Sequence, residues 1–133
     1  MQLGEVLQEF GALAGFKTLE TNENGVVHMT IHKVGDLFID EKYRDESGGC
    51  VFIYLLRVYD RINGNVYRRA LSLCDYEPDE EFLVNPVLHN DQALGFAIKC
   101  PLITFDLNVL QKVIHKLKDL QDRLEGSDGS LSA

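Results

Sequence analysis

The chain has 133 residues, 45% hydrophobic and 26% charged, which is the composition of an ordinary globular protein of one domain. Its formal net charge of -8 disfavours nucleic acid and anionic membrane surfaces as main partners, because both repel an acidic protein. The N-terminus has no signal-peptide pattern, and no apolar run approaches the ~20 residues that span a bilayer, so we expect a cytoplasmic protein.

The first predicted element is an amphipathic helix over residues 2–14, which Gly15 ends. Asn24-Gly25 then favours a turn, and residues 26–32 alternate between apolar and polar side chains, as in a half-buried strand. After a second turn at Gly35, residues 37–39 are predicted to form a short strand. Polar residues 41–49 are predicted to form the hairpin loop before the next strand.

The strand predicted over residues 51–59, VFIYLLRVY, is apolar on both faces, so we expect it inside a sheet with both faces covered. One face is expected to pack on the C-terminal helix and the other to lie toward the first helix. The alternate set of residues that contains Arg57 is expected at a rim or an interface. The apolar surface exceeds what two modest helices cover, which favours a partner chain, most simply a two-fold dimer.

The second half of the chain is predicted to form a short helix over residues 66–74, an acidic loop over 75–81 and strands over 82–89 and 93–100. Pro86 places the first of these strands at a sheet edge. Thr104 is the predicted N-cap of a long helix that ends at Gly126. The domain therefore comprises residues 1–126, and residues 127–133, rich in Ser and Gly, form a flexible tail.

The order of these elements predicts an α+β fold: helix, three antiparallel strands, short helix, two strands and long C-terminal helix. Cys50, Cys74 and Cys100 are widely spaced and odd in number, so we expect reduced thiols rather than disulfides.

No recognisable catalytic or metal-binding pattern is present in the sequence. His28 and His32 are four residues apart, but they lie on an alternating strand and no HExxH sequence occurs. Residues 60–65, DRINGN, have Ile62 where a calcium loop needs an acidic or amide side chain. We therefore expect no enzyme, no metal and no cofactor; a small enzyme that uses Cys74 or a histidine is the rival from another class.

Two blocks of sequence resemble the class I type III secretion chaperones of the Tir-chaperone (CesT) type. Residues 3–31, LGEVLQEFGALAGFKTLETNENGVVHMTI, are similar to the opening helix, glycine break and first strand of that family. Residues 93–124, ALGFAIKCPLITFDLNVLQKVIHKLKDLQDRL, are similar to its last strand, short turn and long closing helix. The middle departs from the family pattern, because residues 65–76 are short and carry Arg68 and Arg69 where members have a leucine-rich helix.

This resemblance implies a cytoplasmic homodimer, associated with bacterial virulence, that binds the N-terminal segment of secreted effectors without ATPase activity or cofactor. The implied effector-binding residues lie on the first helix and first two strands: Leu3, Val6, Leu7, Phe10, Val27, Met29, Ile31, Leu37 and Ile39. The implied dimer interface lies on the short helix and the strand after it: Val66, Ala70, Leu73 and Leu83. The alternative is a YbjN-like α+β interaction or regulatory protein without a role in secretion.

Overall fold

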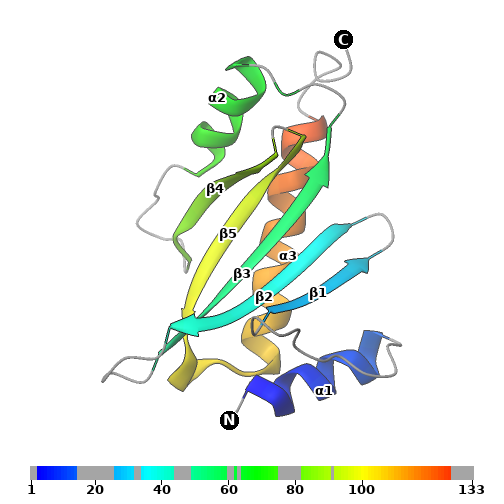
Figure 1. Ribbon diagram of the computed structural model, residues 1–133, viewed down its shortest axis with the longest axis vertical. Helices are drawn as coiled ribbons and strands as arrows, with labels where there is room; N and C mark the ends of the chain where they lie inside the picture. The colour runs from blue at the N-terminus through cyan, green and yellow to red at the C-terminus, as the bar shows by residue number, and fades with distance from the viewer. Residues whose placement is uncertain are drawn as a thin grey trace.

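The computed structural model describes residues 3–14, 26–31, 34–43, 49–59, 62, 64–74, 82–90 and 92–126 (Figure 1). The turn predicted at residues 24–25, the acidic loop at 75–81 and the tail at 127–133 lie outside these residues. The elements are α1 (Leu3–Ala14), β1 (Val26–Ile31), β2 (Gly35–Tyr43), β3 (Cys50–Val58), α2 (Gly64–Leu73), β4 (Val84–His89), β5 (Ala93–Pro101), the 3-10 helix η1 (Leu102–Thr104) and α3 (Leu107–Gly126). The predicted α+β fold and the predicted order of elements are confirmed.

The strands of the described chain form one antiparallel sheet in the order β1-β2-β3-β5-β4. β3 lies at its centre, paired with β2 on one side and with β5 on the other. β4, which contains Pro86, lies at an edge as predicted, since proline has no N–H to donate to a further strand. Figure 1 shows α3 running along the sheet, with α1 at one end of the molecule and α2 at the other.

The hydrophobic core lies between α3 and one face of the sheet. Val51, Ile53 and Leu55 of β3 are fully buried on this face, together with Leu110, Leu117 and other apolar residues of α3. α1 packs into the same core through Val6, Leu7 and Phe10, and it contacts α3. The expectation that α1 covers the opposite face of β3 is therefore wrong, because both helices bury their apolar stripes against the same face.

The position of Arg57 also differs from the expectation. The alternate residues Val51, Ile53 and Leu55, which share its side of β3, form the deep core. Arg57 itself lies at the end of that row, where its guanidinium reaches Asp122 and Glu125 of α3. A long side chain at the end of a buried row can keep its charge paired while its stem packs on apolar neighbours.

Several element boundaries differ from the sequence prediction, most clearly the end of β2 and the start of α3. β2 extends to Tyr43, because its pairing with β3 continues through an irregularity between Asp40 and Tyr43. α3 begins at Leu107, and Asp106 rather than Thr104 caps it: the Asp106 carboxylate accepts a hydrogen bond from the Val109 N–H at 2.8 Å. A carboxylate suits this position because it satisfies a free N–H and faces the positive end of the helix dipole.

Candidate partner-binding surfaces

The face of the sheet opposite α3 is not covered by any helix of the described chain (Figure 1). We call it the open face. Its side chains come from alternate positions of all the strands, and they include both aromatic and small residues: Val26, His28 and Thr30 of β1; Asp36, Phe38 and Asp40 of β2; Phe52, Tyr54, Leu56 and Val58 of β3; Ala93, Ala97 and Lys99 of β5; Asn85, Val87 and His89 of β4. Val58 is 71% exposed, which is unusual for a valine of a central strand.

Three rings of the open face stack across three neighbouring strands. The ring of Phe38 lies between that of His28, with centroids 4.4 Å apart, and that of Tyr54, at 4.8 Å. The ring planes are nearly parallel, 4° and 8° apart, because the three residues are directly opposite one another in the strand register. The spacing matches the distance between neighbouring strands. We call this set the ring stack.

Charged side chains flank the ring stack on both sides. The Asp36 carboxylate accepts a hydrogen bond from the Thr30 hydroxyl at 2.7 Å and lies 3.2 Å from Nε2 of His28. The hydrogen bond from Thr30 holds the pKa of the Asp36 carboxyl below its ordinary value, against the opposing effect of burial. On the other side, the Lys99 ammonium lies 5.8 Å from the centroid of the Phe52 ring, within cation–π range.

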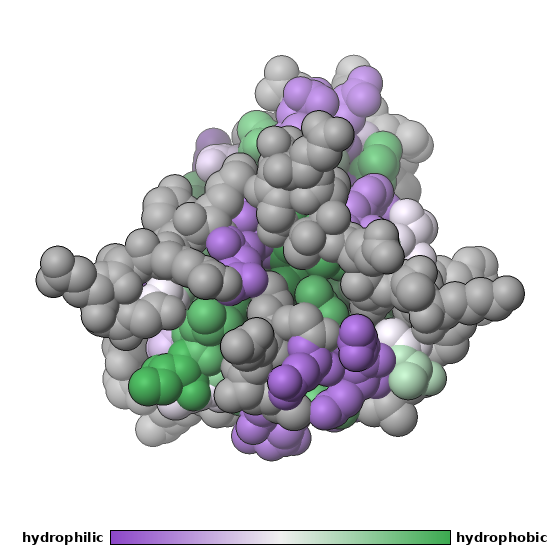
Figure 2. Space-filling model, turned by 60° about the horizontal axis from the view of Figure 1, so that its bottom comes forward, coloured by the Kyte–Doolittle hydropathy of each residue, from purple (hydrophilic) through white to green (hydrophobic). Residues whose placement is uncertain are grey.

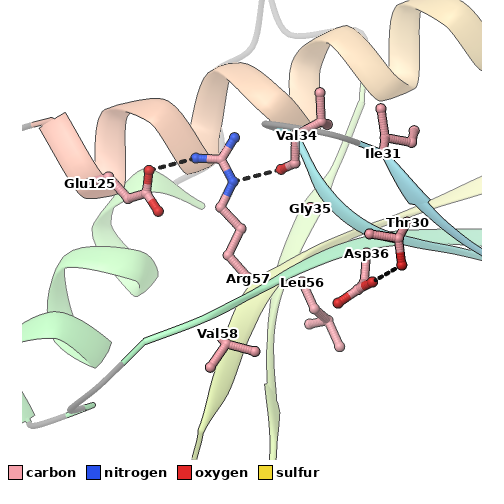
Figure 3. Close-up of a pocket in the computed structure, with 9 residues that line it drawn as sticks. All are labelled: Thr30, Ile31, Val34, Gly35, Asp36, Leu56, Arg57, Val58 and Glu125. Carbon is pink, nitrogen blue, oxygen red and sulfur yellow. Dashed lines mark hydrogen bonds and ion pairs between the residues drawn. The ribbon is translucent and has the colours of Figure 1, made fainter.

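The open face ends at a hollow of about 460 Å³ beside the C-terminal end of α3 (Figure 3). The Arg57 side chain crosses it: Nε donates to the Val34 carbonyl at 2.6 Å and Nη1 to Glu125 at 2.8 Å. Asp122 accepts from Nη2 at 3.0 Å. Arg57 thus joins the turn between β1 and β2 to α3, and each of its three guanidinium nitrogens donates a hydrogen bond within the chain. The lining is completed by open-face and turn residues: Thr30, Ile31, Gly35, Asp36, Leu56 and Val58.

A second polar cluster lies entirely within the core. Gln121 of α3 is fully buried; its amide N–H groups donate to the Leu55 and Leu94 carbonyls at 3.0 and 2.9 Å, and its oxygen accepts from the Tyr59 hydroxyl at 2.7 Å. Burial, aided by the charge of Glu125, raises the pKa of Tyr59, so this hydroxyl stays protonated. Because every polar atom of the Gln121 side chain has a partner, the cluster holds α3 on the sheet and offers no group for chemistry.

The residues that the resemblance assigned to effector binding lie mainly inside the core. Each of the following is at most 9% exposed and belongs to the one core cluster that α3 also joins: Val6, Leu7, Phe10, Val27, Met29, Leu37 and Ile39. Ile31 is half-buried and lines the hollow, and the side chain of Leu3 lies outside the described residues. That these residues contact an effector stays a prediction.

The residues assigned to the dimer interface divide into two groups. Val66 and Ala70 are buried where α2 packs toward α3 and β4, and Leu73 is half-buried beside them. Leu83, just before β4, is 65% exposed, and Leu71 of α2 and Leu88 of β4 are also exposed. These exposed apolar side chains lie on α2 and along β4, with Leu83 and Leu88 at opposite ends of that strand.

The opposite end of the molecule, which carries α1 and η1, also has apolar side chains at its surface. Figure 2 views this end and shows hydrophobic groups beside hydrophilic ones. Ile103 of η1 is 82% exposed, more than any other large apolar residue of the described chain. α1 presents the polar side chains of Glu5, Gln8 and Glu9 to solvent.

The three cysteines are free thiols in the structure. Cys50 and Cys100 are buried, Cys74 is half-buried, and none of these three forms a disulfide. No group of three or more His, Cys, Asp or Glu residues in the described chain is placed to hold a metal ion. No helix among these residues is long and apolar enough to cross a membrane.

Sequence reasoning did not single out the ring stack, although it placed Phe52, Tyr54, Leu56 and Val58 on one side of β3. The available signal is the alternation in β2. Phe38 shares one face of that strand with Asp36 and Asp40, so an aromatic ring stands on a polar face where packing in the core does not require it. Which rings meet depends on strand register, and the period of two along each strand does not contain it.

Known sequences supply no assignment. No protein-family model matches the chain, and no curated protein sequence matches it.

Solved structures match the fold over almost the whole chain. The Yersinia pestis type III secretion chaperone SycH, in complex with a stable fragment of YscM2, has a TM-score of 0.65 at 20% identity, over 92% of this chain and 98% of that one. The ExsC–ExsE complex gives a TM-score of 0.69 at 13% identity, over 98% and 97%. The HopA1–SchA chaperone–effector complex gives 0.61 at 14% identity, over 92% and 89%.

These likenesses define a class by fold. The chain has the α+β fold of the type III secretion chaperones, with the same elements over nearly its full length. At these identities the likeness establishes the fold alone, and what the chain binds is a separate question.

Proposed function

We propose that the protein is a type III secretion chaperone of the Tir-chaperone (CesT) type. It binds the N-terminal segment of one or more secreted effectors in the bacterial cytoplasm and keeps that segment soluble for secretion, without catalysis or a cofactor. The observation that carries this proposal is the near full-length match to SycH and SchA, each of which was solved bound to another polypeptide.

The open face supports this proposal physically. It presents the ring stack and the exposed Val58 on a rigid sheet, with no helix of the described chain over it. A disordered segment pays a large entropic cost on binding, so it needs an extended apolar surface of this kind to bury. Main-chain pairing at a sheet edge is the usual complement to such burial.

Most of the residues predicted to bind effector are buried, so their proposed role in binding is indirect. Val6 and Phe10 of α1 and Val27 and Met29 of β1 belong to the same buried core, so their proposed role is to support the surface that the effector meets. Direct contact with the effector is proposed for Ile31, which is half-buried beside the hollow at the end of the open face.

The homodimer is proposed to form through α2 and β4. Leu71 of α2, Leu83 before β4 and Leu88 of β4 supply exposed apolar side chains. Val66 and Ala70 hold α2 in place by packing within the chain. An isologous interface of this kind buries the same surface of both protomers.

Co-expression with N-terminal fragments of candidate effectors encoded beside this gene tests the proposed function. We expect one such fragment to become soluble and to co-purify with the chain in a fixed ratio. The Val58→Glu variant, which places a charge on the open face at an exposed position, is expected to lose the fragment while its circular dichroism spectrum is unchanged. If no neighbouring fragment is solubilised or retained, the protein is not a chaperone for a locally encoded effector.

A further inference from the structure

The ring stack ends on β3, two strands short of the far edge of the sheet. Tyr54 is directly opposite Ala97 of β5, and Ala97 is in turn opposite Asn85 of β4. The row across the open face therefore reads His28, Phe38, Tyr54, Ala97 and Asn85. Among the described residues, no ring lies on the face of Tyr54 that is turned away from Phe38.

The space above Ala97 has the size of one more ring. Tyr54 and Asn85 are two strand spacings apart, about 9–10 Å, and only a methyl group rises from the residue between them. Tyr54 and Ala97 are both half-buried and Asn85 is exposed, so a group from outside the chain reaches this space. A planar ring placed here would continue the stack at the spacing that the first rings already have.

The charge beside this space selects the kind of ring. Lys99 is the next open-face residue along β5 from Ala97, and its ammonium already lies over the Phe52 ring. A second cation, such as an arginine guanidinium, would be repelled there. An aromatic ring carries no net charge, so it stacks on Tyr54 without this repulsion.

We propose that the open face binds an apolar polypeptide segment that inserts an aromatic side chain above Ala97, between Tyr54 and Asn85, as the fourth ring of the stack. This inference rests on the proposed function, because it takes the bound segment of an effector as the source of the ring. It goes further in assigning the chemistry of one anchor residue in that segment and the residues that receive it.

A short peptide tests the proposal without knowledge of the effector. The probe is acetyl-Val-Ser-Trp-Ser-Val-amide, titrated into the isotopically labelled full-length chain and followed by NMR; peptides with Leu or Arg in place of Trp are the controls. We expect ring-current shifts of the Ala97 methyl and the Tyr54 ring with the Trp peptide alone. Since the chain has no tryptophan, the fluorescence of the probe reports the same binding independently.

Matched variants locate the site. Ala97→Leu fills the space above the strand and is expected to weaken binding of the Trp peptide about tenfold, the order of one well-formed aromatic contact. Ala93→Leu adds the same side chain to the same strand near the end of the open face and is expected to leave affinity unchanged. Tyr54→Leu removes the stacking partner without adding volume above Ala97. It should also weaken binding of the Trp peptide, and it replaces Ala97→Leu as the test if that variant fails to fold.

The other outcomes either contradict this inference or separate it from the proposed function. Shifts that are absent at Ala97, or equal for the Trp, Leu and Arg peptides, exclude a site for an aromatic ring. If Ala97→Leu halves the mass measured by light scattering, the occupant is a second copy of the chain. If the Trp peptide binds above Ala97 but no effector fragment is retained, this inference holds and the proposed function is contradicted. If a fragment is retained and Ala97→Leu leaves its affinity unchanged, the proposed function holds and this inference is contradicted.

Discussion

Gln121 of α3 donates a hydrogen bond to the backbone carbonyl of Leu55 in β3 at 3.0 Å, and both residues are fully buried. The same amide group reaches the Leu94 carbonyl of β5, so one side chain links the long helix to two adjacent strands. Gly95 is required beside it, since a Cβ there would lie 1.8 Å from the Leu55 oxygen and 2.9 Å from Nε2 of Gln121.

Replacing this glutamine by an apolar residue of similar size should destabilise the fold. Gln121→Leu leaves the Leu55 and Leu94 carbonyls and the Tyr59 hydroxyl without their partner, and we expect a loss of about 2–4 kcal/mol in the free energy of unfolding. Urea denaturation measures it. Gln111→Leu, the same substitution at an exposed position of α3, is the control and should change stability little. Equal effects at both positions would show that the buried amide contributes nothing specific.

Much of the fold follows from residue patterns. The alternation in β1, the apolar run of β3 and the helical stripe of α3 each determine an element, because burial of one face selects a period of two or of 3.6 residues. Pro86 correctly marked β4 as an edge strand. Gln121 interrupts the α3 stripe between Leu117 and Leu124, which was a visible sign of a buried polar contact.

What the patterns do not contain is the relation between elements that are distant in sequence. An apolar stripe shows that α1 is buried but not against which face of the sheet, so the placement of α1 opposite α3 was wrong. The ring stack likewise depends on the register between β1, β2 and β3, which sets His28, Phe38 and Tyr54 in one row. Thr104 and Asp106 are both good caps, and only the path of the backbone after η1 decides between them.

Stability below neutral pH should depend on the Thr30–Asp36 hydrogen bond. Because this bond lowers the pKa of Asp36 from 3.8 in the folded chain, the folded state binds fewer protons than the unfolded state. The resulting stability is fully present above the unfolded-state pKa and is lost as the pH falls through the lower folded-state pKa. The wild-type chain should therefore be more stable than Thr30→Val above about pH 4, and the difference should shrink on acidification.

Chemical denaturation from about pH 6 down to about pH 3 measures this difference. Thr30→Ser keeps a hydroxyl at the same position and should follow the wild-type pH profile. A stability difference between the wild type and Thr30→Val that does not vary with pH would show that the effect comes from strand propensity rather than from Asp36.

The buried stripe of α3 should be sensitive to truncation. Leu117 is fully buried in the main core, so Leu117→Ala should lower the free energy of unfolding by about 2–5 kcal/mol, through lost apolar burial and the cavity that results. Ile114 is only half-buried against the same core, and Ile114→Ala should cost less. A denaturation midpoint unchanged in both variants would mean that α3 does not pack on the sheet in solution.

The proposed dimer makes a prediction for the exposed apolar side chains of α2 and β4. Leu83 is 65% exposed, so a charge there is tolerated in an isolated chain but would be buried in an interface built on α2 and β4. Leu83→Glu should therefore change the mass measured by light scattering from that of two chains to that of one, with an unchanged circular dichroism spectrum. Ile103→Glu places the same charge at a comparably exposed apolar residue of η1, remote from α2, and should leave the dimer intact. A wild-type mass of one chain contradicts the dimer itself, and a dimer lost only in Ile103→Glu would place the interface at the α1 and η1 end.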